Sequence, residues 1–159
     1  MESSEWPEDP AERVKAVVER VLDQLELDGS VLIEEDDEAI VATVEGEEDY
    51  GLLIGRRGQT IDAIQLLCFQ AAFQGIRERK RVVLDAAGYR EKREEVITER
   101  AERAAEKAIA GGEEVELDPM PARERRVVHE YLKERTEVET YSAGDEPQRR
   151  VVVAPLLSD

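Results

Sequence analysis

Apolar residues near the start of the chain recur with the period of an α-helix. Asp9, Pro10 and Glu12 are the residue types that favour the N-cap, N1 and N3 positions of a helix start. We expect the helix to end at Asp28-Gly29, where glycine can take the left-handed conformation that closes a helix. The apolar stripe between these signals consists of Val14, Val17, Val18, Val21, Leu22 and Leu25.

Two short runs rich in β-branched residues follow this helix. They are residues 31–33 and 39–44, and the acidic stretch 34–38 separates them. This pattern predicts a β-hairpin, but the turn lacks an Asn-Gly pair and leaves the register of the strands open.

A second helix and a third strand complete the first half of the chain. The segment 51–60 contains three glycines, and an apolar stripe of helical period begins near Gln59 and ends at Gly75. Residues 81–85 are typical of a strand. The predicted order is α-β-β-loop-α-β.

The residue pattern in the second half of the chain predicts a long charged helix followed by a smaller unit. The helix covers residues 88–110 and ends at Gly111-Gly112, and we interpret it as a bridge. Beyond it we expect a strand at 115–117, a helix at 122–134, and strands at 137–141 and 149–154. We therefore expect an α+β protein with a disordered leader (1–8), a first domain (9–86), a linking helix (87–111) and a second domain (112–159).

The composition excludes several classes of protein. The chain has 159 residues, of which 41% are hydrophobic, enough for a packed core. A single Cys and a single His exclude an internal disulfide and a zinc cluster built by one chain. No apolar run reaches the length of about 18 residues that a membrane span needs. The acidic N-terminus lacks a signal peptide. We therefore expect a cytoplasmic protein without metal or cofactor.

The charge is unevenly distributed. The net charge is −17, with 22 basic and 39 acidic side chains. Residues 1–50 hold 3 basic and 18 acidic residues, whereas residues 51–81 hold 6 basic and 2 acidic residues. Because exposed charges more than about 8–10 Å apart are largely screened, this basic segment can bind an anion within an acidic chain.

The basic segment contains two glycines separated by two arginines. The glycines leave the backbone bare, and Gly58 lies at a helix start, where free N–H groups favour an anion. Arg56 and Arg57 add charge for phosphates. A plain turn is the alternative interpretation, and the absence of a following Gly-Lys-Ser/Thr excludes a Walker loop.

The I-G-x-x-G-x-x-I motif, in this order of elements, resembles a KH domain of the prokaryotic type II topology (α-β-β-α-α-β). In KH domains the G-x-x-G loop clamps the backbone of about four nucleotides, and an adjacent apolar groove seats the bases. The resemblance implies an RNA-binding site formed by Ile54, Gly55, Arg56, Arg57, Gly58, Gln59, Thr60 and Ile61.

A second motif lies on the predicted helix 122–134. Arg125 and His129 are four residues apart, and therefore on one helix face. Alone, this pair is most simply an exposed Arg and His on a solvated helix. The following residues 140–153 resemble the end of the R-x-x-x-H (R-three-H) domain, a small α/β module linked with single-stranded nucleic acid. The resemblance implies a second contact surface of Arg125 and His129, extended by Arg126, Arg149 and Arg150.

The tandem order resembles the Jag family, also called KhpB or EloR, over roughly residues 10–155. This resemblance implies a non-enzymatic, single-stranded RNA-binding protein: a bacterial post-transcriptional regulator, RNA chaperone-like and tied to cell-wall elongation and cell shape. It implies a partner too, either a small single-KH protein of the KhpA type or a second copy of the chain. Many members carry an extra N-terminal domain. This sequence begins almost at the KH region, so functions of that domain are not carried over.

Two other function classes remain to be weighed. A protein-interaction adaptor with weak or lost nucleic-acid binding is suggested by the net charge of −17. A hydrolase or nuclease has little support, because His129 has no accompanying Gly-x-Ser-x-Gly elbow and the sequence offers no metal cluster. The sequence leaves open whether the second domain prefers RNA or single-stranded DNA.

Overall fold

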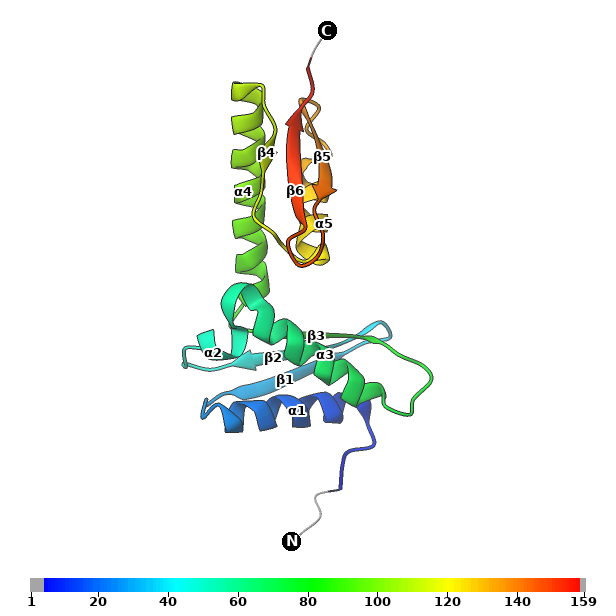
Figure 1. The fold of residues 1–159 in the computed structure, drawn as a ribbon. Helices are drawn as coiled ribbons and strands as arrows, with labels where there is room; N and C mark the ends of the chain where they lie inside the picture. Colours follow the sequence, from blue (N-terminus) through cyan, green and yellow to red (C-terminus); the bar gives the residue numbers. More distant parts are fainter. Residues whose placement is uncertain (1–4, 158–159) are drawn as a thin grey trace. The chain divides into compact units, whose positions relative to one another are not determined.

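A computed structural model describes residues 5–157, and the chain forms two compact units (Figure 1). The first unit runs to Arg90, and the second begins at Glu91. Each has its own three-stranded sheet and its own hydrophobic core. Half of the predicted leader, residues 1–4, lies outside the described residues. In its other half, the carbonyl of Pro7 accepts a hydrogen bond of 2.6 Å from Arg13 Nε.

The first unit has the α-β-β-α-α-β order that the resemblance to a type II KH domain implies. The short second helix passes through a 3₁₀ turn at Arg56–Gly58 into the third. The elements are α1 (Pro10–Gln24), β1 (Ser30–Glu35), β2 (Ala39–Glu45), α2 (Gly51–Ile54), α3 (Gln59–Phe73) and β3 (Arg81–Ala86).

The sheet of the first unit has the strand order β1-β2-β3, so β3 is an edge strand. β1 and β2 are antiparallel, and β2 and β3 are parallel. Helices α1 and α3 pack side by side on one face (Figure 1). Alternate strand residues point towards them, as the period of a strand requires. The strand residues of this core cluster are Ile40, Ala42, Val44, Val82, Leu84 and Ala86.

The hairpin turn is closed by a carboxylate in place of the absent Asn-Gly pair. The Asp36 side chain accepts hydrogen bonds from the N–H groups of Glu38 and Ala39, both at 2.8 Å. These bonds hold the pKa of Asp36 below its usual value. The register that the sequence left open pairs Ser30 with Glu45.

The prediction that α1 extends to Asp28-Gly29 was wrong. The helix ends at Gln24, and Glu26 takes the left-handed conformation with φ 54°. The N–H of Leu27 donates to the carbonyl of Leu22 at 3.0 Å, the bond that closes a Schellman motif. Leu27 also packs against the core. The early end therefore follows from the burial of Leu27.

The second unit combines an antiparallel sheet of order β4-β6-β5 with two helices. Its elements are α4 (Tyr89–Gly111), which starts on the last two residues of the first unit, β4 (Val115–Glu116), α5 (Ala122–Leu132), β5 (Val138–Ala143) and β6 (Arg150–Pro155). The α+β class expected from the sequence is thereby confirmed. Among residues 5–157, no helix is both long and apolar enough to cross a membrane.

Most of α4 belongs to the second unit, whereas we expected residues 87–111 to be a separate link. The physical reason is the thin apolar stripe of the helix, in which small side chains allow close packing. Ile97, Ala101, Ala104, Ala105 and Ala108 share one core with Val128, Leu132, Val151 and Val153.

A bidentate ion pair between α4 and α5 reinforces this packing. Arg93 Nε donates to Glu124 Oε1 at 2.9 Å, and Arg93 Nη2 donates to Glu124 Oε2 at 3.1 Å. Only 4% of the Glu124 side chain and 16% of the Arg93 side chain are exposed. Charged groups this deeply buried require a well-matched partner.

We predict that Glu124→Ala lowers the free energy of unfolding by about 3 kcal/mol, because Arg93 loses its buried carboxylate partner. Urea denaturation followed by circular dichroism measures the change. The control is Glu99→Ala, which removes the exposed i,i+4 pair with Arg103 and should cost several-fold less. Equal losses in the two variants would contradict the importance assigned to the buried pair.

Candidate nucleic-acid interface

The loop between α2 and α3 requires glycine at its first position. Gly55 has φ 73° and ψ 177°, a conformation that is essentially restricted to glycine. A Cβ atom here would lie 2.6 Å from Thr60 Cβ and 2.9 Å from Thr60 N. The turn therefore brings bare backbone against the start of α3.

The second glycine is fixed by a contact with the start of α4. Gly58 is buried with φ 75°, and a Cβ atom would lie 2.8 Å from the ring atom Cε1 of Tyr89. Arg57, between the glycines, also has a positive φ of 55°. The backbone thus takes a tight left-handed path over an aromatic ring, and the loop has a defined shape.

The side chains that this loop presents to solvent are basic or polar. Arg56 and Arg57 are exposed, and so are Gln59 and Thr60. Gly58 is the N-cap of α3 and provides no side-chain cap for the first N–H groups of the helix. Two guanidinium groups therefore stand beside the positive end of a helix dipole, an arrangement that suits a phosphate group.

Ile61 differs from its expected role. The resemblance to KH domains placed Ile54 and Ile61 in the RNA-binding site, but Ile61 is fully buried in the core of the first unit. Ile54 is half-buried and packs against the same core. Ile61 is therefore an anchor of α3 beneath the loop, and its side chain has no surface with which to contact a ligand.

A polar network next to the loop occupies part of the edge of β3. Gln65 Oε1 accepts from the N–H of Leu84 and from Arg90 Nη2, both at 2.9 Å. Arg90 Nε donates to the carbonyl of Leu84 at 2.7 Å, and Arg90 Nη1 pairs with Asp62 at 2.9 Å. Both outward backbone groups of Leu84 are therefore satisfied by side chains.

The basic segment divides into exposed and paired groups. Lys80 is bound to the β1–β2 hairpin, where it contacts Glu35 at 3.2 Å and the carbonyl of Asp36 at 2.7 Å. The remaining basic residues of the segment are exposed: Arg56, Arg57, Arg77, Arg79 and Arg81.

The second predicted site has a different character, because Arg125 is buried. Only 7% of this residue is exposed. Its Nη1 donates to the carbonyl of Met120, and its Nη2 contacts Glu146, both at 2.6 Å. The expectation of an accessible Arg125 is therefore corrected: this guanidinium holds two loops of the second unit together.

His129 is held between two hydroxyl groups of β5. Its Nδ1 lies 2.6 Å from Thr140 Oγ1, and its Nε2 lies 3.1 Å from Ser142 Oγ. Burial, and then the charge of Arg125, lower the pKa of His129 below its usual value. The imidazole is therefore neutral near pH 7 and adds no positive charge to the surface.

The other basic residues of this motif are more accessible. Arg126 is exposed on α5, whereas Arg149 and Arg150 are half-buried. Arg149 donates to the carbonyl of Gly144 at 2.8 Å, and Arg150 contacts Glu116 at 3.4 Å. In this unit, Arg126 is the predicted contact residue that is most open to a ligand.

Three features of this interface were not predicted from the sequence. Tyr89 beneath the loop and Arg90 at the strand edge come from a helix that was interpreted as a link. The third is the approach of Arg79 to Phe69, with the guanidinium carbon 5.9 Å from the ring centroid. No pattern in the sequence signals these contacts, because periodicity within one element says nothing about its neighbour.

Two family models match the chain, one for each unit. Residues 11–85 match the model described as "KhpA/KhpB, KH domain". Residues 95–155 match the model of the R-three-H domain, which therefore includes most of α4.

Bacterial relatives match both regions in one chain. The RNA-binding protein KhpB of Bacillus subtilis (strain 168) is 29% identical over 148 residues, covering 92% of this chain and 71% of that protein. The protein of the same name from Clostridium symbiosum is 35% identical over 139 residues, covering 86% of this chain and 62% of that protein. The one from Lactiplantibacillus plantarum is 43% identical over 104 residues, covering 65% of this chain. The match spans only 32% of the Lactiplantibacillus plantarum protein. For two of the three relatives, the chain thus spans less than two thirds of their length.

Substitution of the buried glycine tests the geometry of the loop. We predict that Gly58→Ala destabilises the fold more than Gly75→Ala, by roughly 1–3 kcal/mol. Both glycines have nearly the same positive φ, but a Cβ at Gly75 meets nothing within 4 Å, whereas one at Gly58 meets Tyr89. Urea denaturation of the two variants gives the difference, and equal losses would contradict the contact with Tyr89.

The burial of His129, together with the nearby charge of Arg125, predicts a dependence of stability on pH. Because the folded pKa is lowered, the unfolded chain binds a proton first as the pH falls through about 6.5. The free energy of unfolding should therefore decrease from about pH 7.5 to about pH 5.5, and the decrease should be smaller in His129→Gln. If the two proteins show the same decrease in urea denaturation, burial of a neutral imidazole is refuted.

Proposed function

Because this chain belongs to the KhpB (Jag) family, whose members join a KH domain to an R-three-H domain, we propose that it is a non-enzymatic protein that binds single-stranded RNA. The proposed main contact is the loop between α2 and α3. One observation carries the proposal: Arg56 and Arg57 are exposed beside the uncapped start of α3 in a strongly acidic chain.

The proposed binding mode uses the backbone of the RNA. Phosphate groups approach the bare backbone of Gly55 and the N–H groups at the start of α3, and the two arginines neutralise their charge. A KH loop clamps the backbone of about four nucleotides in this way. The contact with Tyr89 supports it, since a loop of fixed shape loses less entropy on binding.

The second unit supplies a weaker contact in this proposal. Arg126, Arg149 and Arg150 face the nucleic acid, while Arg125 and His129 maintain the frame that positions them. RNA or single-stranded DNA satisfies this chemistry equally, because a phosphate contact carries no base information. Two weak sites in one chain gain affinity through effective concentration.

The proposed wider role is that of a cytoplasmic, RNA chaperone-like regulator in bacteria, which acts on small RNAs and messages and is linked to cell-wall elongation and cell shape. The resemblance to the family motivates this role, and the names of the relatives support its RNA-binding part. The proposed protein partner is a single-KH protein of the KhpA type or a second copy of the chain. Leu52 of α2 and Leu66 of α3 are exposed apolar side chains that such a partner would cover.

Charge reversal at the loop tests the proposed function. We predict that Arg56→Asp/Arg57→Asp lowers the affinity for single-stranded RNA at least about tenfold at low salt. It should also reduce the slope of log affinity against log salt by about 1–2, because two phosphate contacts are lost. The measurement is a titration of labelled RNA at several salt concentrations, with circular dichroism to confirm folding.

The matched control is Lys15→Glu/Arg20→Glu, which makes the same change in net charge on α1. This variant should bind RNA almost as the unmodified chain does. Equal losses in the two variants would show that net charge alone governs binding and would contradict a site at the loop. A folded chain without RNA affinity that forms a stable complex with a KH protein would instead establish the adaptor function.

A further inference from the structure

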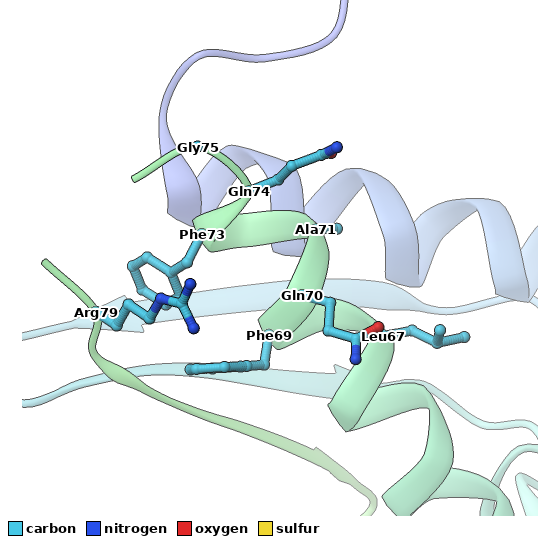
Figure 2. Close-up of a pocket in the computed structure, with 8 residues that line it drawn as sticks. All are labelled: Leu67, Phe69, Gln70, Ala71, Phe73, Gln74, Gly75 and Arg79. Atoms are coloured by element: carbon cyan, nitrogen blue, oxygen red, sulfur yellow. The ribbon is translucent and has the colours of Figure 1, made fainter. Parts of the chain in front are cut away.

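An open pocket of about 610 Å³ lies at the C-terminal end of α3 (Figure 2). The half-buried ring of Phe69 has its centroid 5.5 Å from that of the buried Phe73, with 56° between the planes. The guanidinium of Arg79 lies over the Phe69 ring. Gln70 and Gln74 also line the pocket, but their side chains extend away from the two rings (Figure 2). A flat ring with a cation over it provides the stacking contacts that a nucleobase makes.

A nucleic-acid strand that starts at the loop and follows α3 would reach the pocket. Gln65, Phe69 and Phe73 follow one another at one-turn intervals, and they therefore share one face of α3. The distance from Gln59, at the start of the helix, to Phe69 is about 15 Å for ten residues. Between these points a base cannot bond to the backbone of Leu84, because Gln65 and Arg90 already occupy both of its polar groups.

The charge around the pocket favours a polyanion as its occupant. Arg77, Arg79 and Arg81 are all exposed, and within residues 5–157 no ion pair involves any of them. An apolar protein surface that covered these guanidinium groups would remove them from water without compensation. A nucleic-acid strand instead places phosphates beside them and releases its own counterions.

We propose that the pocket formed by Phe69, Phe73 and Arg79 stacks a nucleobase of the RNA strand held at the loop. This inference rests on the proposed function and extends it, because the footprint becomes longer than the four or so nucleotides of a KH loop. Base stacking on an aromatic ring tolerates different bases, so the pocket adds affinity without a strict sequence preference.

Single-stranded RNAs of two lengths, about four and about ten nucleotides, test the proposal with the full chain. A longer RNA can occupy the loop in several registers, which alone raises its affinity. Beyond this statistical factor, the unmodified protein should bind the longer RNA about tenfold more tightly than the short RNA, which corresponds to the contribution of one stacked base. Phe69→Leu and Arg79→Ala should lose this gain but retain affinity for the short RNA. Arg56→Asp/Arg57→Asp should lose affinity for both. Lys15→Ala removes one positive charge from α1 and should keep the gain.

A fluorescent base identifies the stacked position directly. In longer RNAs with 2-aminopurine at successive positions, one position distant from the loop-bound nucleotides should be quenched, and Phe69→Leu should abolish this quenching. If RNA binds but neither variant changes the length gain or the quenching, the pocket proposal is refuted while the proposed function stands. Failure of the unmodified chain to bind either RNA refutes both. A change of sedimentation in Phe69→Leu, with the length gain intact, would assign the pocket to contacts between copies.

Discussion

The contact between Gly58 and the ring of Tyr89 is the constraint on which the proposed interface depends. With no Cβ at Gly58, the loop backbone lies directly against the ring, and the left-handed conformations of Gly55, Arg57 and Gly58 follow one path. Ile61, buried below, fixes the start of α3. Packing thus determines the shape of the loop, and its two arginines are left to face solvent. A preformed site of this kind binds without first ordering its own backbone.

The distribution of charge determines where the first unit can bind a nucleic acid. Most of the chain is acidic, which keeps nucleic acid away from its general surface. The exposed arginines lie at the two ends of α3, at the loop and beside the pocket, and the hairpin carboxylate of Glu35 pairs with Lys80 instead of with them. An RNA strand that lies along α3 would therefore contact positive charge at both ends of this helix. Between those ends it would meet a polar network that closes the edge of β3 at Leu84.

The sequence predicted those features that a single element reveals. The periods of apolar residues located all but the short α2, and the G-x-x-G spacing located the loop. The sequence-based predictions were wrong where a contact with a residue distant in the chain determines the structure. Leu27 ends α1 early by packing on the core, and the alanines of α4 join a core that lies after them in the chain. The i,i+4 spacing placed Arg125 and His129 on one face, but only Met120, Glu146 and β5 determine that this face is largely covered. Phe69 and Arg79 come from a helix and a loop, so no periodicity joins them.

The central claim is that one RNA strand occupies both the loop and the far end of α3. Chemical-shift mapping of backbone amides during titration with single-stranded RNA tests it most directly, because every residue reports separately. The account predicts shifts at Gly55–Thr60 with short RNA, joined by shifts at residues 69–81 when the RNA is long enough to reach the pocket. Shifts confined to the second unit, or spread evenly over the acidic surface, would contradict it.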